Sequence, residues 1–164
     1  MLDVQQYELV KCNMGIELSD PSFQQTTGVR VNKHLPLPIA FDFKRTSSYD
    51  TSGSVVPYQS AVLNQGDAMS LNGVFTVPVD GIYEFTFNAN KYGSDVPTMM
   101  YLRLDGNVVA RIYGYSVDDS MSETVILQLS AGQKVDAYLL SGSASIVGDG
   151  YRDIHFVGRL LFVS

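Results

Sequence analysis

Alternating apolar and polar positions dominate residues 38–164 of the chain. The stretch FTVPVDGIYEFTF, residues 75–87, shows the pattern most clearly, because Tyr83, Phe85 and Phe87 recur at every second position. This spacing places all three rings on one face of a strand, whereas a helix would scatter them around its surface. A proline and a glycine between the two halves predict a turn. The stretch is therefore interpreted as a β-hairpin whose buried face is aromatic.

Similar short runs, separated by turn residues, follow one another along this part of the chain. In YLRLDGNVV, the Asp-Gly-Asn cluster at 105–107 predicts a hairpin turn, because these residues tolerate a positive φ. Ala131 and Gly132 predict a second hairpin turn, between Leu129 and Val135. After residue 38 the sequence shows no sustained 3.6-residue apolar repeat. The pattern predicts an all-β protein, an antiparallel sandwich or jelly roll.

The last predicted strand carries apolar side chains on both faces. Its faces are Ile154, Phe156, Gly158, Leu160 and Phe162 on one side, and His155, Val157, Arg159, Leu161 and Val163 on the other. A strand that is apolar on both sides needs cover on both sides. The first face can meet the core of the domain. The second is expected to meet another subunit, so the pattern favours an oligomer.

Composition and charge exclude several classes of partner. The 164 residues carry a net charge of −6 and include ten tyrosines and eight phenylalanines. An acidic chain with scattered cations has no electrostatic footprint for nucleic acid or an anionic membrane. No apolar run approaches the roughly 20 residues that a membrane-spanning helix needs. We therefore expect neither nucleic-acid binding nor membrane insertion.

The first 37 residues differ in kind from the rest. Their apolar positions show at most a short heptad pattern, followed by loop-like sequence, so residues 1–37 are expected to be an N-terminal segment or linker and 38–164 a single domain. Cys12 is the only cysteine and is free or paired between chains. The start MLDVQQYELVKC lacks the features of a signal peptide. The protein either stays in the cell or is a mature or trimmed form.

Candidate chemistry is sparse. His34 and His155 have no catalytic or metal-binding motif around them, and we interpret both as ordinary surface or interface residues, so no enzyme activity is expected. Two loops, 113–123 and 141–153, are rich in acids, hydroxyls and tyrosines. Such loops suit calcium or polyhydroxyl ligands, although they could equally be solvated turns. The side chains predicted to contact a ligand or cation are Tyr115, Asp118, Asp119, Asp149 and Tyr151.

Several motifs together resemble the globular C1q domain family. Phe75, five residues, and then Gly-Ile-Tyr-Glu-Phe-Thr-Phe at 81–87 is similar to the central signature of that family. Tyr58 stands where phenylalanine is usual, and Asn64 fits the expected spacing after it. The runs AF at 40–41, VILQLSAGQKV at 125–135 and FVGRLLF at 156–162 extend the likeness in the same order.

The resemblance implies a ten-stranded antiparallel jelly-roll sandwich, shared with the tumour necrosis factor superfamily and assembled as a homotrimer. Without a collagen-like repeat, the chain looks like a soluble invertebrate-type member. Some relatives bind calcium through acids near Asp119, although here Gly114 replaces the expected partner acid. The resemblance therefore implies a calcium site at Asp119 that lacks one of its expected acids.

Three functions remain open at this stage. The first is a secreted, lectin-like recognition module of innate immunity that binds carbohydrate or other surface patterns as a trimer. The second is a cytokine-like ligand of a cell-surface receptor. The third is a structural matrix protein.

Overall fold

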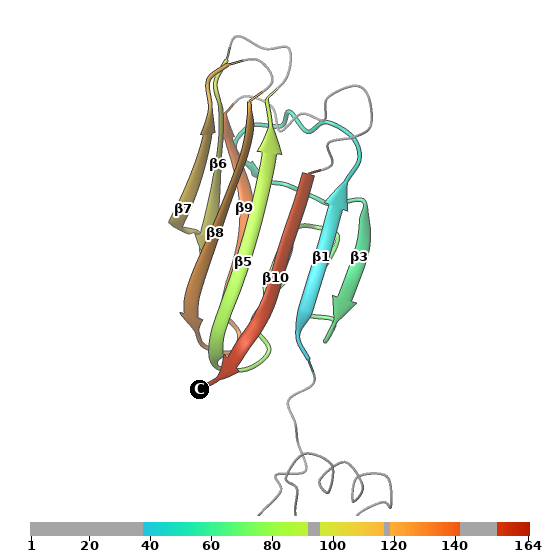
Figure 1. Cartoon of the computed structure of the whole chain (residues 1–164), viewed down its shortest axis with the longest axis vertical. Helices are drawn as coiled ribbons and strands as arrows, with labels where there is room; N and C mark the ends of the chain where they lie inside the picture. Colours follow the sequence, from blue (N-terminus) through green and yellow to red (C-terminus); the bar gives the residue numbers. More distant parts are fainter. Residues whose placement is uncertain (1–37, 92–95, 117–118, 142–153) are drawn as a thin grey trace, which may run out of the picture. The chain divides into compact units, whose positions relative to one another are not determined.

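A computed structural model describes residues 38–91, 96–116, 119–141 and 154–164 of the chain. The described residues form ten strands in two antiparallel sheets (Figure 1). The strands are β1 (Ala40–Arg45), β2 (Ser54–Val55), β3 (Ser60–Gln65), β4 (Val74–Thr76), β5 (Gly81–Asn90), β6 (Thr98–Leu104), β7 (Asn107–Gly114), β8 (Ser120–Leu129), β9 (Lys134–Ser141) and β10 (Ile154–Val163). The predicted all-β jelly-roll sandwich is thereby confirmed.

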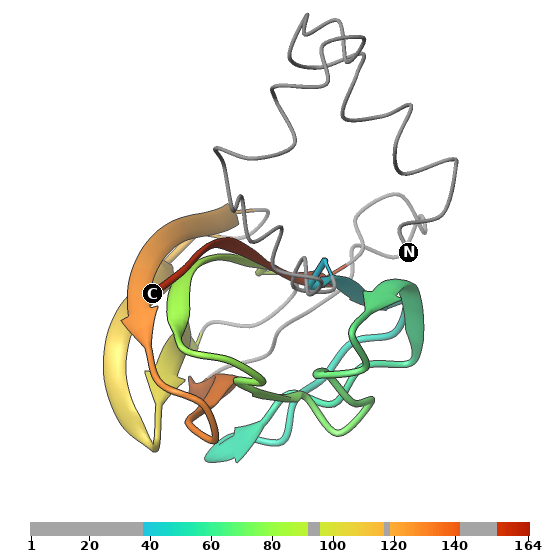
Figure 2. The same cartoon turned by 90° about the horizontal axis from the view of Figure 1, so that it is seen from below.

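The two sheets differ in which strands they join. The five-stranded sheet has the order β3-β1-β10-β5-β8, and the second sheet has the order β2-β9-β6-β7 with β4 also paired to β9. Seen from below, the strands surround a common interior (Figure 2). Within the described ranges, no helix is long and apolar enough to cross a membrane.

Aromatic rings fill the interior between the sheets. Phe41 and Phe75 lie with their ring centroids 5.1 Å apart, Phe75 and Phe85 5.5 Å apart, and Phe85 and Phe156 6.0 Å apart. All four are at most 2% exposed. Edge-to-face and offset contacts at these distances add to the burial of large apolar area. Strands from both sheets supply the rings, so this cluster holds the sandwich together.

The stretch 75–87 has the predicted buried face but not the predicted hairpin. Tyr83, Phe85 and Phe87 are fully buried. However, β4 pairs with β9, whereas β5 pairs with β10 and β8 in the other sheet. Phe75 therefore meets Tyr83 across the interior, with their ring centroids 5.7 Å apart. Alternation decides which face a side chain occupies, but it does not decide which strand becomes the neighbour, so the hairpin prediction was wrong.

The two other predicted turns have different outcomes. The turn at 105–107 is a hairpin, because β6 and β7 pair antiparallel on either side of it. Its Asp105 and Gly106 adopt φ values of 49° and 82°, which favour these residue types. The turn at Ala131 and Gly132 instead joins the two sheets, because β8 pairs with β5 whereas β9 pairs with β6. The second hairpin prediction was wrong for the same reason as the first.

Phe162 and Val163 at the end of the last strand lie on the faces opposite to the predicted ones. The register of β10 against β5 shifts between Leu160 and Phe162, and Phe162 pairs with Ile82. A bulge of this kind turns the following side chain to the other face. Phe162 is 67% exposed and lies outside the core, whereas strict alternation had placed it on the core face. Ile154 and Phe156 are buried as expected.

Candidate functional site

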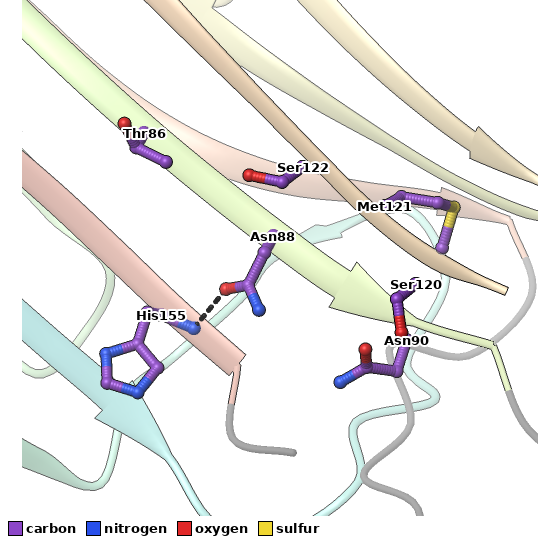
Figure 3. A pocket seen from close by; sticks show the side chains of 7 residues that line it. All are labelled: Thr86, Asn88, Asn90, Ser120, Met121, Ser122 and His155. Carbon is purple, nitrogen blue, oxygen red and sulfur yellow. Dashed lines mark hydrogen bonds between the residues drawn. The ribbon is translucent and has the colours of Figure 1, made fainter. Parts of the chain in front are cut away.

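A polar pocket opens on the outer face of the five-stranded sheet, where β5 ends and β8 and β10 begin (Figure 3). Its volume is about 330 Å³. The lining side chains are Thr86, Asn88 and Asn90 from β5, Ser120, Met121 and Ser122 from β8, and His155 from β10. Six of these seven residues offer hydroxyl, amide or imidazole groups, which can donate or accept hydrogen bonds.

Alternation along the strands creates this pocket. Successive side chains of β5 point alternately to the aromatic interior and to the outer face, so Thr86 and Asn88 lie outside while Phe85 and Phe87 lie inside. The register pairs Thr86 with Thr124 and Asn88 with Ser122, which places polar groups side by side on neighbouring strands. The aromatic core thus holds the pocket wall on a rigid sheet.

Hydrogen bonds fix the pocket's edge beside β10. The backbone N–H of His155 donates to Asn88 Oδ1 (Figure 3), and His155 Nδ1 lies 2.6 Å from Asp42 Oδ1 on β1. The Thr86 and Thr124 hydroxyls lie 2.7 Å apart. These contacts link the four strands β1, β10, β5 and β8 across the outer face, and the contact with Asp42 holds the imidazole toward β1 at the pocket rim.

The opposite end of the same outer face is apolar. An ion pair between Arg159 and Glu84, with Nη2 and Oε1 2.8 Å apart, separates the pocket from it. Ile126, which is 62% exposed, lies opposite Glu84 on β8. In the next outward-facing row Phe162, which is 67% exposed, lies opposite Ile82. One sheet face therefore has a polar half and an apolar half.

Of the predicted contact residues, the structure brings Tyr115 and Asp119 together. Asp119 Oδ2 accepts hydrogen bonds from the backbone N–H groups of Tyr115, at 2.8 Å, and Ser116, at 2.7 Å. The carboxylate therefore closes the turn between β7 and β8. The Tyr115 side chain is 71% exposed and available to a partner molecule. Asp118, Asp149 and Tyr151 lie outside the described residues.

Gly114, at the end of β7, lies against the side chains of Met121 and Asp119. A Cβ atom at this position would lie 2.6 Å from Met121 Sδ and 3.3 Å from Asp119 Cβ. Such distances leave no room for a side chain unless Met121 shifts. Gly114 thus has a packing role, because the Met121 side chain occupies the space that a side chain at residue 114 would need. This is the position at which the resemblance leads one to expect an acid.

The described ranges contain no group of three or more His, Cys, Asp or Glu side chains that could hold a metal ion. Asp119 contributes one carboxylate, and one of its oxygens already accepts two backbone hydrogen bonds. Calcium prefers six to eight oxygen ligands. A calcium role for Asp119 therefore stays a prediction that needs further ligands.

Sequence reasoning missed the pocket as a site. Its signal was present in β5, where Glu84, Thr86, Asn88 and Asn90 alternate with aromatic or apolar residues. That pattern indicates a polar outer face but does not show which strands lie beside it. His155 was interpreted as an ordinary surface or interface residue, and the structure adds its contact with Asp42 at the pocket rim.

Comparison with known proteins identifies the family. The family model of the C1q domain matches residues 40–161 of this chain. The chain belongs to the C1q domain family. Human complement C1q tumor necrosis factor-related protein 3 is 32% identical over 130 residues, which cover 77% of this chain and 52% of the relative, and the mouse protein of that name gives the same values. The chain thus spans about half the length of the curated relatives it matches.

Solved structures support the same fold. The globular domain of zebrafish complement 1qA protein has a TM-score of 0.63 and 21% identity, and the match covers 77% of this chain and 99% of that one. Eiger TNF from S. frugiperda has a TM-score of 0.61 and 11% identity, with 79% and 96% covered. C1q domains are non-enzymatic recognition or cytokine-like modules, and membership of this family agrees with the expectation that the chain is not an enzyme.

Proposed function

We propose that this C1q domain protein is a secreted, trimeric recognition module that binds carbohydrate or other repeated surface patterns, with a lectin-like role in innate immunity. The observation that carries the proposal is the divided outer face of the five-stranded sheet. Its apolar half is suited to burial against other subunits, and its polar half is suited to a hydroxyl-rich ligand.

The apolar half supports assembly. Ile126 and Phe162 are more than 60% exposed, and Phe162 lies opposite Ile82 on the same face. Large apolar side chains gathered on one sheet face favour association, because burial stabilises by roughly 25 cal/mol per Å² of apolar area. The family resemblance implies three copies. A trimer would present three identical binding sites and multiply a weak single-site affinity through avidity.

The polar half and the adjacent turn support ligand binding. Ser120 and Ser122 line the pocket directly after Asp119, and Tyr115 lies exposed on the other side of the turn. Hydroxyl and amide groups match the donors and acceptors of a sugar, and a tyrosine ring can cover its apolar face. The proposed contacts are Tyr115, Asp118, Asp119, Asp149 and Tyr151, together with the pocket residues.

We propose that calcium bound by Asp119 assists the binding of the sugar. Hard cations bind carboxylate oxygen, and Asp119 Oδ1 is not used by the two backbone bonds that close the turn. Further ligands would come from a bound sugar, from water or from the acids of the loops at 113–123 and 141–153. A calcium-dependent gain in sugar binding would support this role.

A glycan array probed with the full chain, with calcium and then with chelator, tests the proposal. Binding to defined sugars supports it, and loss of that binding with chelator supports the calcium role. Absence of any glycan signal, together with saturable binding to cell surfaces, would contradict it. That outcome would favour a cytokine-like ligand, the second candidate, which the structural similarity to Eiger TNF supports.

A further inference from the structure

The outer face of the second sheet carries an aromatic surface around Arg111, which has no ion pair within the described ranges. The register places Tyr138 on β9 opposite Tyr101 on β6, and Tyr101 opposite Arg111 on β7. Met99 lies opposite Tyr113 in the next row. Residues directly opposite one another share a face, with Cβ atoms about 4.5–5.5 Å apart. Two tyrosines therefore flank Arg111, one across the strands and one along β7.

The two arginines on this face, Arg103 and Arg111, differ in whether their charge has a partner. Arg103 binds Asp136 through two hydrogen bonds, of 2.8 and 3.0 Å, and its guanidinium lies 3.8 Å from the centroid of the Tyr138 ring. The Asp136 carboxylate thus compensates the charge of Arg103 within the fold. Arg111 is exposed and forms no ion pair or hydrogen bond within the described ranges. A planar guanidinium without a partner is suited to a carboxylate, which it can hold through two parallel bonds.

The rings beside Arg111 narrow the class of ligand. Tyr113 is 50% exposed, while Tyr101 is half-buried and donates a hydrogen bond from its hydroxyl to Met99 Sδ at 3.2 Å. That bond orients the phenol along β6. Aromatic rings that neighbour a cation in a sheet can cover the apolar face of a sugar while the cation binds its acid group. Because the strands fix the backbone of these residues and a hydrogen bond fixes the Tyr101 ring, binding orders mainly the exposed side chains of Arg111 and Tyr113.

We propose that Arg111, with Tyr101 and Tyr113, forms a binding site for a carboxylate-bearing sugar, such as a uronic acid unit of a polysaccharide. This inference rests on the proposed carbohydrate-binding function and names a second site for it, on the other sheet from the polar pocket. The net charge of −6 repels anions at long range, so a single site binds weakly. A polysaccharide that repeats the acidic sugar offsets this loss by contacting several copies of the site at once.

The test uses the full chain and an immobilised oligosaccharide of galacturonic acid, with its methyl ester as the neutral comparison. We expect binding to the acid and at least about tenfold weaker binding to the ester. Arg111→Gln should weaken binding to the acid by about tenfold or more, and Tyr113→Ala should also weaken it. Arg111→Lys should bind less tightly than the wild type, because lysine cannot form the two parallel bonds.

Lys134→Gln is the matched control, because it removes one exposed positive charge from the same sheet, at the start of β9 and four residues from Tyr138, which lies opposite Tyr101. It should bind the acid as the wild type does. Equal binding of the acid and the ester, or unchanged binding by Arg111→Gln, would overturn the inference. Equal binding of a polyglutamate peptide would overturn the sugar class. Binding of neutral glycans on the array with no effect of Arg111→Gln would overturn this site alone, whereas binding of no glycan would overturn the proposed function as well.

Discussion

Phe162 lies directly opposite Ile82 on the outer face of the five-stranded sheet, because β10 is bulged between Leu160 and Phe162. Without the bulge, the ring would continue the buried row of Ile154 and Phe156. The shift instead adds a large exposed ring to a face that already exposes Ile126. A local irregularity at the end of one strand thus enlarges the apolar surface available to another subunit.

The aromatic cluster should be structural and not part of a ligand site. Phe85 is fully buried and contacts Phe41, Phe75, Tyr83 and Phe156. Phe85→Ala should lower the free energy of unfolding by about 3–5 kcal/mol, measured by urea denaturation, or yield insoluble protein. Tyr115→Ala, at a ring that is 71% exposed, is the control and should change stability little. A folded Phe85→Ala that lost only ligand binding would contradict the assignment.

Tyr58 should be replaceable by phenylalanine without loss of stability. Its hydroxyl is buried and has no hydrogen-bond partner within the part of the chain that the structure describes. Leaving such a group unpaired costs about 1–3 kcal/mol. Tyr58→Phe should therefore keep or raise the free energy of unfolding at neutral pH. A clear loss of stability in urea denaturation would show that the hydroxyl has a partner.

The same variant should change the response to alkaline pH. Burial raises the pKa of Tyr58 above its ordinary value of 10.0, and burial also raises the pKa of Tyr83. Above that ordinary value the unfolded state loses these protons while the folded state keeps them, so the free energy of unfolding falls as pH rises. Each tyrosine contributes a slope of up to about 1.4 kcal/mol per pH unit. Tyr58→Phe should remove one such contribution, and identical slopes for the variant and the wild type would refute this.

Asp119 should have a structural role that can be separated from any role in calcium binding. Asp119→Ala removes the acceptor of two backbone hydrogen bonds and should cost about 1–3 kcal/mol of stability. Asp119→Asn keeps an acceptor oxygen but removes the charge, so it should cost less. If calcium binds here, Asp119→Asn should abolish the effect of calcium on thermal unfolding while remaining folded. An unchanged calcium effect in Asp119→Asn would exclude Asp119 as a ligand.

Particular residues show how far the sequence predicts this structure. The alternation of Tyr83, Phe85 and Phe87 predicted a buried face, and the Asp-Gly-Asn cluster predicted the hairpin that the structure confirms. The partner of each strand could not be predicted, because pairing depends on contacts between residues far apart in the chain. The hairpin expected at 75–87 became a connection between sheets for this reason.

The candidate site shows the same limit. The polar residues of β5 could be placed on one face from their alternation, yet the pocket exists only because β8 and β10 lie on either side of that strand. Likewise, Arg111 and Tyr101 are ten positions apart in sequence, and the register of β6 and β7 makes them neighbours. The position of Phe162 depends on a bulge, which strict alternation cannot predict.

The molar mass of the protein in solution tests the central claim, a trimer assembled through the apolar half of the outer face. Light scattering at micromolar concentration should return about 54 kDa, three times the chain mass of 18.0 kDa. Phe162→Asp should reduce the mass toward that of one chain, because it places a charge in the buried contact. Leu71→Asp, at a residue that is 50% exposed in the loop before β4, is the control and should remain trimeric. A wild-type particle of 18.0 kDa would contradict the account.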